Sequence, residues 1–201
     1  MTVRTELGWR GRPFAGAIGL RPPIAEHADA EGRLLEQYAE GAHTVVEIGV
    51  AEGVSARRLR AVMDRQGTLY LIDPFRPGNV GISFTRMVAR RAVGGVRHGR
   101  AVWFRKKSYE VAPGWNREID FLFIDGDHSF EGVSRDWEEW SRHVKPGGRV
   151  ALHDAVMAKG SWASPADGPA RLFENVIARS SEWAVLGSAV SMVVVERRPE
   201  T

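Results

Sequence analysis

Apolar and polar positions along the chain alternate between two periods. Short apolar runs, typical of strands buried on both faces, are followed by stretches in which apolar residues recur every three or four positions, typical of amphipathic helices. The apolar runs that predict strands are residues 44–49, 68–73, 100–104, 119–125 and 149–154. The helical stretches are residues 29–40, 55–63, 83–93 and 129–144. Such repeated β-α units predict a parallel sheet with helices on both of its faces.

Local signals predict where these helices begin and end. The residues expected to face inward on the helix over 83–93 are Phe84, Met87 and Val88. Ser55 and Ser129 are expected to cap the N-termini of two helices. Pro146-Gly147-Gly148 is expected to stop the helix before the fifth strand, and Pro169 to start a last helix.

The two ends of the chain differ from this middle part. Gly and Pro interrupt any period over residues 1–27, which predicts an irregular arm or lid in front of a single domain over residues 28–201. Near the C-terminus, apolar runs over 183–186 and 190–196 are joined by Gly187-Ser188-Ala189. A link this short predicts an antiparallel hairpin, so the sheet should be parallel except at this end.

Composition narrows the class of protein. The chain has 201 residues, 43% of them hydrophobic, which suits one α/β domain with a buried core. It has no Cys, which excludes disulfides and thiolate chemistry. The net charge is only +3 and the basic residues are scattered, so we expect no nucleic-acid partner. The N-terminus lacks the apolar run of a signal peptide, and no stretch reaches the ~18 apolar residues of a membrane span, so we expect a cytoplasmic protein without a membrane partner.

Polar residues gather where the predicted strands end. They are Glu47, Gly49, Asp73, Ser108, Asp125, His153 and Asp154. Ligands of parallel α/β sheets bind at the carboxyl ends of the strands. A random distribution would not place an acid at the end of so many strands. The sequence therefore predicts a ligand site at this edge of the sheet.

The first two strand ends indicate a nucleoside ligand. Gly49 and Gly53 let the backbone between strand and helix approach a ligand closely, and the helix N-terminus offers N–H donors to a carboxylate. Their Gly-x-x-x-Gly spacing differs from the Gly-x-Gly-x-x-Gly of dinucleotide sites. Asp73 can bind both hydroxyls of a ribose. Each feature alone also fits a plain turn, Asp73 with Pro74 for example. Together they are much more specific.

These residues resemble a known family. Glu47-x-Gly49-x-x-x-Gly53, Asp73, Asp125 and Lys145-Pro146-Gly147-Gly148 look like the core of class I methyltransferases that binds S-adenosylmethionine (SAM). The resemblance covers residues 30–197 and implies a Rossmann-like seven-stranded sheet of order 3-2-1-4-5-7-6. The cofactor-binding residues that it implies are Glu47, Gly49, Gly53, Asp73, Ser108 and Asp125. In the family, the glycine loop packs on the methionine part, the acid at Asp73 binds the ribose, and residues around Lys107 and Ser108 border the adenine.

A narrower resemblance concerns the fourth and fifth strands. The stretch 124–133, with Asp125 and His128, and the later pair His153-Asp154 are similar to small bacterial enzymes related to macrocin and mycinamicin sugar O-methyltransferases and to the cephalosporin hydroxylase-like group. This likeness implies that Asp125 and Asp154 bind Mg²⁺ or Mn²⁺ and that His128 is the general base. His153 stands where that pattern has an acid. As a third ligand it would favour Mn²⁺, Fe²⁺ or Zn²⁺ over Mg²⁺. Strand alternation favours His153 pointing away from Asp154, and the two converge only if the strand has already ended.

The chemistry of these residues suits methyl transfer to a hydroxyl. A hydroxyl is a poor nucleophile unless a base removes its proton or a metal lowers its pKa. Asp125 and His128 could do so, or could merely open a helix. Four further histidines have no other candidate site residues next to them in the sequence, and we expect them to lie at the surface or to serve packing. They are His27, His43, His98 and His143. We predict a SAM-dependent enzyme that acts on a small-molecule hydroxyl in a sugar, polyketide or other secondary metabolite.

Two other functions remain open at this point. An NAD-dependent Rossmann oxidoreductase shares the fold and the acid after strand two, but the glycine spacing and the acid-rich strand ends disfavour it. A non-catalytic nucleotide- or RNA-binding module would need a basic aromatic face. The polar loop 155–168, with Trp162, and the N-terminal arm are expected to shape the acceptor pocket. The sequence leaves a homodimer open.

Overall fold

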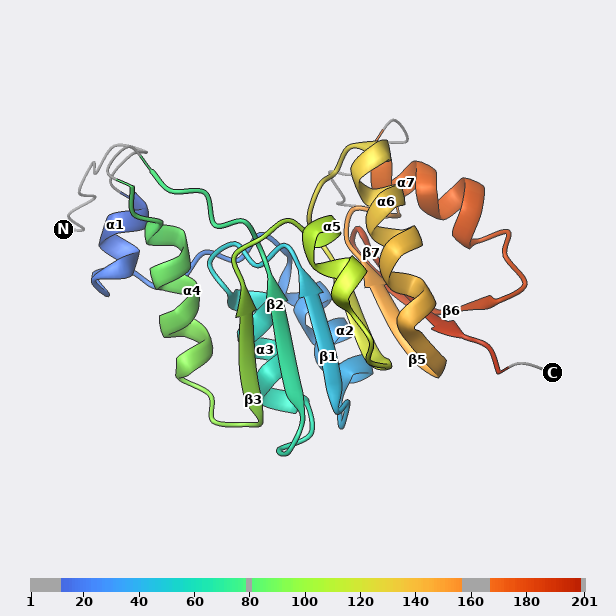
Figure 1. Cartoon of the computed structure of the whole chain (residues 1–201), viewed down its shortest axis with the longest axis horizontal. Coiled ribbons are helices and arrows are strands. Elements are labelled where there is room, and N and C mark those ends of the chain that lie inside the picture. The colour runs from blue at the N-terminus through green and yellow to red at the C-terminus, as the bar shows by residue number, and fades with distance from the viewer. Residues whose placement is uncertain (1–11, 79–80, 157–166, 200–201) are drawn as a thin grey trace.

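The chain folds into three layers, with one sheet between two groups of helices (Figure 1). The structure is a computed structural model that describes residues 12–78, 81–156 and 167–199. The strands are β1 (Thr44–Ile48), β2 (Thr68–Ile72), β3 (Arg100–Phe104), β4 (Ile119–Ile124), β5 (Val144–Leu152), β6 (Trp183–Ala189) and β7 (Met192–Arg197). Their order is β3-β2-β1-β4-β5-β7-β6, and only the pairs β5–β7 and β6–β7 are antiparallel. The predicted fold and strand order are confirmed.

Helices cover both faces of the sheet because successive strand residues point to opposite sides. The helices are α1 (Arg12–Ala17), α2 (Asp29–Ala39), α3 (Val54–Val62), α4 (Phe84–Gly94), α5 (Ser108–Val111), α6 (Phe130–Trp140) and α7 (Gly168–Leu172). On β1, Val45 packs in a buried cluster with Leu35, Leu59 and Ala89 of α2, α3 and α4. Its neighbour Val46 packs in a second cluster on the opposite face. The residues that α5, α6 and α7 contribute to that second cluster are Val111, Val133, Trp137, Trp140 and Leu172.

The strand register brings several loops to one edge of the sheet. Ile48, the last residue of β1, pairs with Ile72 of β2 and with Ile124 of β4. Ile124 in turn pairs with Leu152, the last residue of β5. Because these four strands end level with one another, the residues that follow them lie close together. These residues include the polar ones predicted to form the site.

The N-terminal arm is not wholly irregular, contrary to the prediction for residues 1–27. Residues Arg12–Ala17 form the short helix α1, which lies against α4 (Figure 1). The ring of Phe14 meets that of Phe84 edge to face, with centroids 5.4 Å apart. Since an isolated helix of six residues is not stable in water, we attribute α1 to this tertiary contact, which local periodicity does not reveal.

Several helix details also differ from the predictions. Gly53, at φ 78°, rather than Ser55, is the N-cap of α3. Ser129 does cap α6, and its side chain accepts a hydrogen bond from the N–H of Gly132. Met87, expected inside, is 45% exposed. Helix α6 ends at Trp140, well before the predicted stop, and β5 already spans residues 144–152, Pro146-Gly147-Gly148 included. The longer strand pairs with β4 and β7, and these contacts override the local breaker signal.

The C-terminal hairpin is confirmed, but its predicted turn is wrong. Strand β6 continues through Ala189, and the chain turns at Val190 and Ser191, where Val190 has φ 51°. Gly187 is a strand residue paired with Val194. A Cβ there would stand 2.9 Å from the hydroxyl of Tyr38, which donates to the carbonyl of Leu186 at 3.0 Å. Gly187 therefore serves the close approach of α2 rather than a turn.

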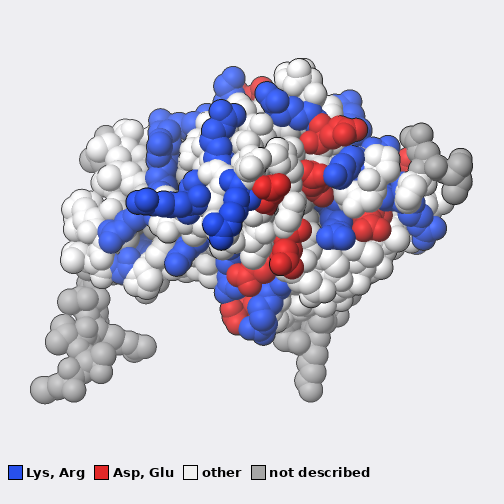
Figure 2. Space-filling view, turned by 90° about the horizontal axis from the view of Figure 1, so that it is seen from below, with Lys and Arg blue, Asp and Glu red and all other residues white. Residues whose placement is uncertain are grey.

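Charge is distributed unevenly over the face at the amino ends of the parallel strands. Figure 2 shows Lys and Arg concentrated on the side that carries α4 and β3, and Asp and Glu gathered towards the middle. The surface at this face thus carries both signs. Within the described ranges, no helix is long and apolar enough to span a membrane.

Candidate active site

A cavity of about 920 Å³ opens at the carboxyl ends of β1 to β4. Its walls are the loops that follow these strands, the beginning of α6, and Ile24, Glu26 and His27 from the segment before α2. The predicted site residues that line it are Gly49, Gly53, Asp73, Ser108, Asp125 and His128. The structure therefore brings together most of the residues singled out in the sequence. It also adds His27, which was expected only in packing or at the surface. His27 is buried, and its Nε2 has no hydrogen-bond partner among the described residues.

The segment in front of α2 is tied to the loop after β1. Arg21 donates to both carboxylate oxygens of Glu52, at 2.5 and 2.7 Å, and the N–H of Ile24 donates to the same side chain at 2.8 Å. These bonds hold residues 21–27 over the cavity. That the arm shapes the acceptor pocket stays a prediction. In the other predicted acceptor segment, loop 155–168, residues 157–166 with Trp162 lie outside the described residues.

Gly49 is the tightest point of the cavity floor. Its φ is +86°, and a Cβ there would stand 2.0 Å from the backbone oxygen of Asp125. Its N–H donates to the carbonyl of Ile72 at 3.0 Å. Only glycine meets both conditions, because an L side chain is strained at this φ and would collide with backbone that cannot turn aside. The loop after β1 thus lies directly against the end of β4.

Asp73 holds this loop in place. Its Oδ2 accepts the N–H groups of Val50 and Ala51 at 3.0 and 3.2 Å, and its Oδ1 accepts that of Phe75 at 2.6 Å. A carboxylate offers about four acceptor positions, so one remains for a ligand. Asp73 is therefore both a structural tie and a wall of the cavity.

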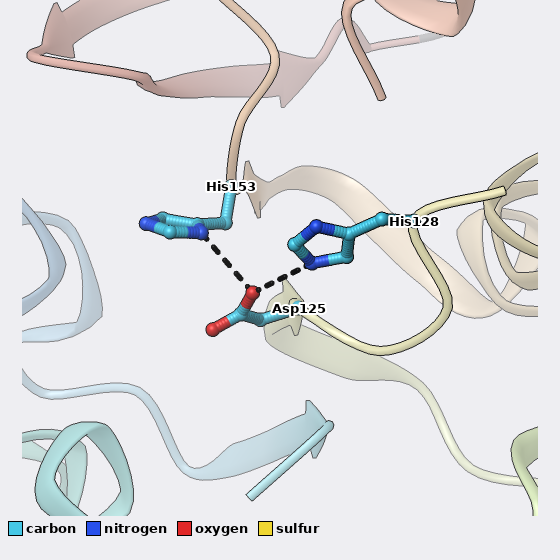
Figure 3. A group of neighbouring side chains, drawn as sticks. All are labelled: Asp125, His128 and His153. Atoms are coloured by element: carbon cyan, nitrogen blue, oxygen red, sulfur yellow. Dashed lines mark hydrogen bonds and ion pairs between the residues drawn. The ribbon is translucent and has the colours of Figure 1, made fainter. Parts of the chain in front are cut away.

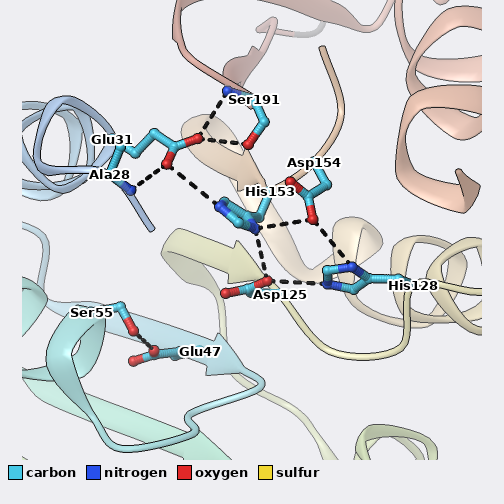
Figure 4. Close-up of polar contacts among 9 residues, drawn as sticks. All are labelled: Ala28, Glu31, Glu47, Ser55, Asp125, His128, His153, Asp154 and Ser191. Carbon is cyan, nitrogen blue, oxygen red and sulfur yellow. Dashed lines mark hydrogen bonds and ion pairs between the residues drawn. The ribbon is translucent and has the colours of Figure 1, made fainter. Parts of the chain in front are cut away.

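Glu47, also predicted to bind the cofactor, lies beneath the loop rather than in the cavity wall. It is fully buried and accepts a hydrogen bond from Ser55 at 2.5 Å (Figure 4). Burial raises the pKa of Glu47 well above its usual range, which the Ser55 hydrogen bond opposes only in part. Glu47 is thus tied to the first turn of α3 through Ser55 and does not line the cavity.

Two carboxylates and two imidazoles meet at the ends of β4 and β5. Asp125 Oδ1 lies 3.3 Å from His128 Nε2 and 3.1 Å from His153 Nδ1 (Figure 3). Asp154 Oδ2 lies 3.3 Å from His128 Nδ1 and 3.6 Å from His153 Nδ1 (Figure 4). We call these four residues the Asp-His cluster.

The expectation that His153 points away from Asp154 is wrong. Strand β5 ends at Leu152, so strict alternation no longer applies to the next two residues. Asp154 has φ +51°, a left-handed conformation that turns its side chain back towards His153. The convergence follows from this turn.

The carboxylates and imidazoles of the Asp-His cluster stabilise each other's charged forms. The hydrogen bonds and charges of Asp125 and Asp154 raise the pKa of His128 to about 10. Burial lowers the pKa of His153, but Asp125 and Glu31 outweigh it and raise that pKa to about 10 as well. Burial alone would raise the pKa of Asp125, and the two imidazoles lower it instead. In the ligand-free protein at neutral pH, the cluster therefore consists of imidazolium–carboxylate pairs.

Glu31 is a functional candidate that the sequence did not suggest. It is fully buried, and its Oε2 lies 3.6 Å from His153 Nε2. It accepts hydrogen bonds from the N–H of Ala28 at 2.7 Å and from the N–H and hydroxyl of Ser191 at 2.9 and 2.7 Å (Figure 4). Burial raises the pKa of Glu31, but these bonds and the ion pair with His153 outweigh it and lower that pKa to about 2. The one local signal was an acid in the first turn of a helix, which normally indicates only a cap.

A second buried acid lies beside Gly126, the residue that follows Asp125. Ser108, the first residue of α5, donates a short hydrogen bond to Asp136 Oδ1 of α6. Asp136 is 3% exposed and also lines the cavity. Burial raises its pKa to about 6, although the Ser108 hydrogen bond opposes the shift. Nothing in the sequence pattern singled out Asp136.

The Asp-His cluster has the donor atoms for a divalent metal ion. One ligand atom each from Asp125, His128 and His153 lie within 4.8 Å of one another. His153 is only 3% exposed, and neither of its ring nitrogens makes a hydrogen bond of good geometry in the described part of the chain. Asp154, an expected ligand, is not in this set of three. Two imidazoles and one carboxylate suit Mn²⁺, Fe²⁺ or Zn²⁺ better than Mg²⁺.

The fold and the cavity place the chain in a class and then in a family. A sheet of order 3-2-1-4-5-7-6 with a glycine loop and an acid after its first two parallel strands defines the α/β methyltransferase fold. Residues 46–155 match a family model described as "Methyltransferase domain", and this is more than half of the chain. The chain belongs to this family and is a methyltransferase, which decides against an NAD-dependent oxidoreductase.

Solved structures with the same fold include several methyltransferases. The O-methyltransferase TomG from Streptomyces achromogenes, involved in tomaymycin synthesis and solved with SAM, is 17% identical, with 94% of this chain and 89% of that chain covered and a TM-score of 0.67. The O-methyltransferase from Bacillus cereus, solved with S-adenosylhomocysteine (SAH), is 14% identical, with coverages of 92% and 89% and a TM-score of 0.63. A methyltransferase from Geobacter sulfurreducens is 16% identical, with coverages of 94% and 88% and a TM-score of 0.64. At these identities the likeness concerns the fold.

Proposed function

We propose that this methyltransferase uses SAM and transfers its methyl group to a hydroxyl of a small molecule, such as a sugar, a polyketide or another secondary metabolite. The observation that carries the proposal is that Asp125 and His128 of the Asp-His cluster line the same cavity as Asp73 and the Gly49 loop, while His153 and Asp154 are not among its lining residues. The SAM and SAH bound to two of the neighbours support this cofactor.

The geometry suggests how SAM would lie. One of its ribose hydroxyls would donate to the remaining acceptor position of Asp73, and its carboxylate would accept from the N–H groups at the start of α3. The sulfonium would then lie near the contact between Gly49 and Asp125. This orientation directs the methyl group towards the Asp-His cluster.

In the proposed step, a lone pair of the acceptor hydroxyl attacks the methyl carbon while the carbon–sulfur bond breaks. SAH leaves as a neutral thioether, and the hydroxyl proton passes to the ring of His128. His128 lines the cavity and its side chain is 45% exposed, so an acceptor can reach it. It must be neutral to accept a proton, and the positive sulfonium next to Asp125 would oppose the carboxylates that raise its pKa.

A divalent metal ion is the second part of the proposal. Asp125, His128 and His153 would hold it, as their mutual distances allow. Such an ion supplies a Lewis acid that lowers the pKa of a bound hydroxyl. A metal-bound His128 could not also take the proton, so metal binding and proton acceptance by His128 are alternatives that chelation distinguishes.

The proposal is tested in two stages. Calorimetry with SAH should give binding at a 1:1 ratio, and titration with NADH should give none. Methyl-labelled SAM is then incubated with a panel of hydroxylated sugars and polyketides, with and without EDTA. Label transferred to an ether oxygen supports the proposal. Loss of transfer in EDTA and recovery with Mn²⁺ would support the metal ion, whereas transfer that survives EDTA would support a metal-free reaction. Absence of SAH binding by the folded protein would refute the proposal.

A further inference from the structure

A buried carboxylate lies behind His153, on the side of its ring that faces away from the rest of the Asp-His cluster. Nδ1 of His153 faces the cluster and lies 3.1 Å from Asp125 Oδ1 and 3.6 Å from Asp154 Oδ2. The other ring nitrogen, Nε2, faces Glu31, whose Oε2 is 3.6 Å away (Figure 4). The ring therefore stands between the two acids of the cluster and a third acid from α2.

Glu31 is held in place by groups from two distant parts of the chain. The backbone N–H of Ala28, in front of α2, donates to its Oε2 at 2.7 Å. Ser191, in the turn between β6 and β7, donates to its Oε1 through the backbone N–H and the hydroxyl, at 2.9 and 2.7 Å. A carboxylate offers about four acceptor positions, so three are occupied and one remains. That remaining position lies beside His153.

The role of a helix cap accounts for only part of these contacts. An acid in the first turn of a helix normally accepts the N–H in front of the helix, as Glu31 does from Ala28, and this bond requires no burial. Glu31 is nevertheless fully buried, and His153 is 3% exposed. Burying a carboxylate is costly unless its charge has a partner. The contact with His153 gives the buried acid a role that the cap alone does not.

A histidine that binds a metal ion needs such a partner, whereas an aspartate ligand does not. Neutral imidazole carries a proton on one nitrogen and a lone pair on the other, and only the lone pair can bind an ion. A carboxylate behind the ring attracts the N–H and so leaves the lone pair on the far nitrogen. With Glu31 beside Nε2, the far nitrogen of His153 is Nδ1, the one that faces Asp125.

We propose that Glu31 is a positioning residue for the candidate metal site: it accepts the Nε2–H of His153 and directs the Nδ1 lone pair towards an ion shared with Asp125 and His128. On metal binding, His153 loses its Nδ1 proton to solvent and keeps the proton on Nε2. Glu31 itself contacts neither the ion nor the acceptor. The inference rests on the metal ion of the proposed function.

The test uses Zn²⁺ alone as the probe, because it is diamagnetic and accepts imidazole ligands. Calorimetry gives its affinity, and long-range proton–nitrogen NMR spectra of histidine-labelled protein show which ring nitrogen of His153 binds it. The signals of His153 are assigned by their loss in His153→Asn. In the wild-type protein the ion should bind Nδ1, with the proton on Nε2.

Glu31→Gln is the decisive variant. A neutral amide attracts the Nε2–H less and can itself donate to Nε2, which would move the proton to Nδ1. The affinity for Zn²⁺ should therefore fall by about 10- to 100-fold, the usual effect of removing the partner of a metal-binding histidine, and coordination through Nδ1 should weaken or disappear. Ser191→Ala removes one hydrogen bond to the same carboxylate but keeps its charge beside His153, so it should keep coordination through Nδ1. Glu40→Gln, an exposed acid at the end of α2, is the matched control and should leave the affinity unchanged.

The outcomes separate this inference from the proposed function. A Glu31→Gln variant that binds Zn²⁺ through Nδ1 as tightly as the wild type would reduce Glu31 to a cap and overturn the inference. Wild-type protein that binds SAH but not Zn²⁺ overturns the metal ion and the role of Glu31, while the proposed cofactor stands. If Glu31→Gln does not fold, the wild-type spectra decide: Zn²⁺ on Nε2, or His153 not coordinated, would overturn the inference, and Zn²⁺ on Nδ1 with a proton on Nε2 supports it.

Discussion

Replacing Asp136 by Asn should stabilise the ligand-free protein at neutral pH. The carboxyl is 3% exposed, and burial raises its pKa from 3.8 to about 6. Below pH ~4 the group is protonated in both the folded and the unfolded state, and its burial then carries no ionisation penalty. As the pH rises from about 4 to about 6, the unfolded chain releases this proton while the folded chain still holds it, so the protein loses stability. The full loss above pH 7 corresponds to about 3 kcal/mol, from 1.36 kcal/mol per pKa unit.

Urea unfolding of the wild-type protein and of Asp136→Asn at pH 5 and pH 8 measures this difference. Because Asn does not ionise, the stability advantage of the variant should be larger at pH 8 than at pH 5 by about 1.4 kcal/mol. By thermal unfolding this corresponds to roughly 3–6 °C. Glu138→Gln removes an exposed acid from the same helix and should change stability little. Equal pH dependence of Asp136→Asn and wild type would refute the assignment of a buried, destabilised carboxyl.

Three further predictions concern the cavity. Asp73→Ala should weaken SAH binding by about 1.5–3 kcal/mol because the ribose loses its acceptor and the glycine loop its tie, and unchanged calorimetric affinity in a folded variant would contradict the assignment. His128→Ala should lower kcat by roughly 10²- to 10⁴-fold while SAH affinity holds; near-normal turnover with an identified acceptor would leave His128 only a place at the start of α6. Gly49→Ala should lower the free energy of unfolding by about 2–5 kcal/mol, whereas Gly94→Ala, where an added Cβ meets nothing within 4 Å, should not; similar urea midpoints for the two would disprove the steric argument.

The architecture could be predicted from the sequence because its signals are local. Apolar runs such as 68–73 and the helical period between them depend only on neighbouring residues. The strand order came from the resemblance to class I methyltransferases, and the sheet confirms it. The location of the site could also be predicted, because the carboxyl ends of parallel strands lie at the same edge of the sheet. This brings Asp73 and Asp125 to one cavity.

Local signals failed where tertiary contacts decided the outcome. Helix α1 exists because Phe14 packs on Phe84, and Gly187 is a strand residue because α2 lies against it. The convergence of His153 and Asp154 depends on the left-handed conformation of Asp154, which alternation along a strand does not include.

Only the tertiary structure brings together the buried polar pairs. Glu31 bonds to Ser191 across 160 positions of sequence, and Ser108 bonds to Asp136 across 28. Neither acid belongs to a periodic pattern or a motif, since what distinguishes each is burial next to one particular partner. Burial depends on which helices pack over which strand ends, and this is settled only when the helices pack on the assembled sheet. The sequence by itself determined the sheet and the location of the site at the carboxyl ends of its strands. The packing of α2 and α6 decided which acids are buried next to that site.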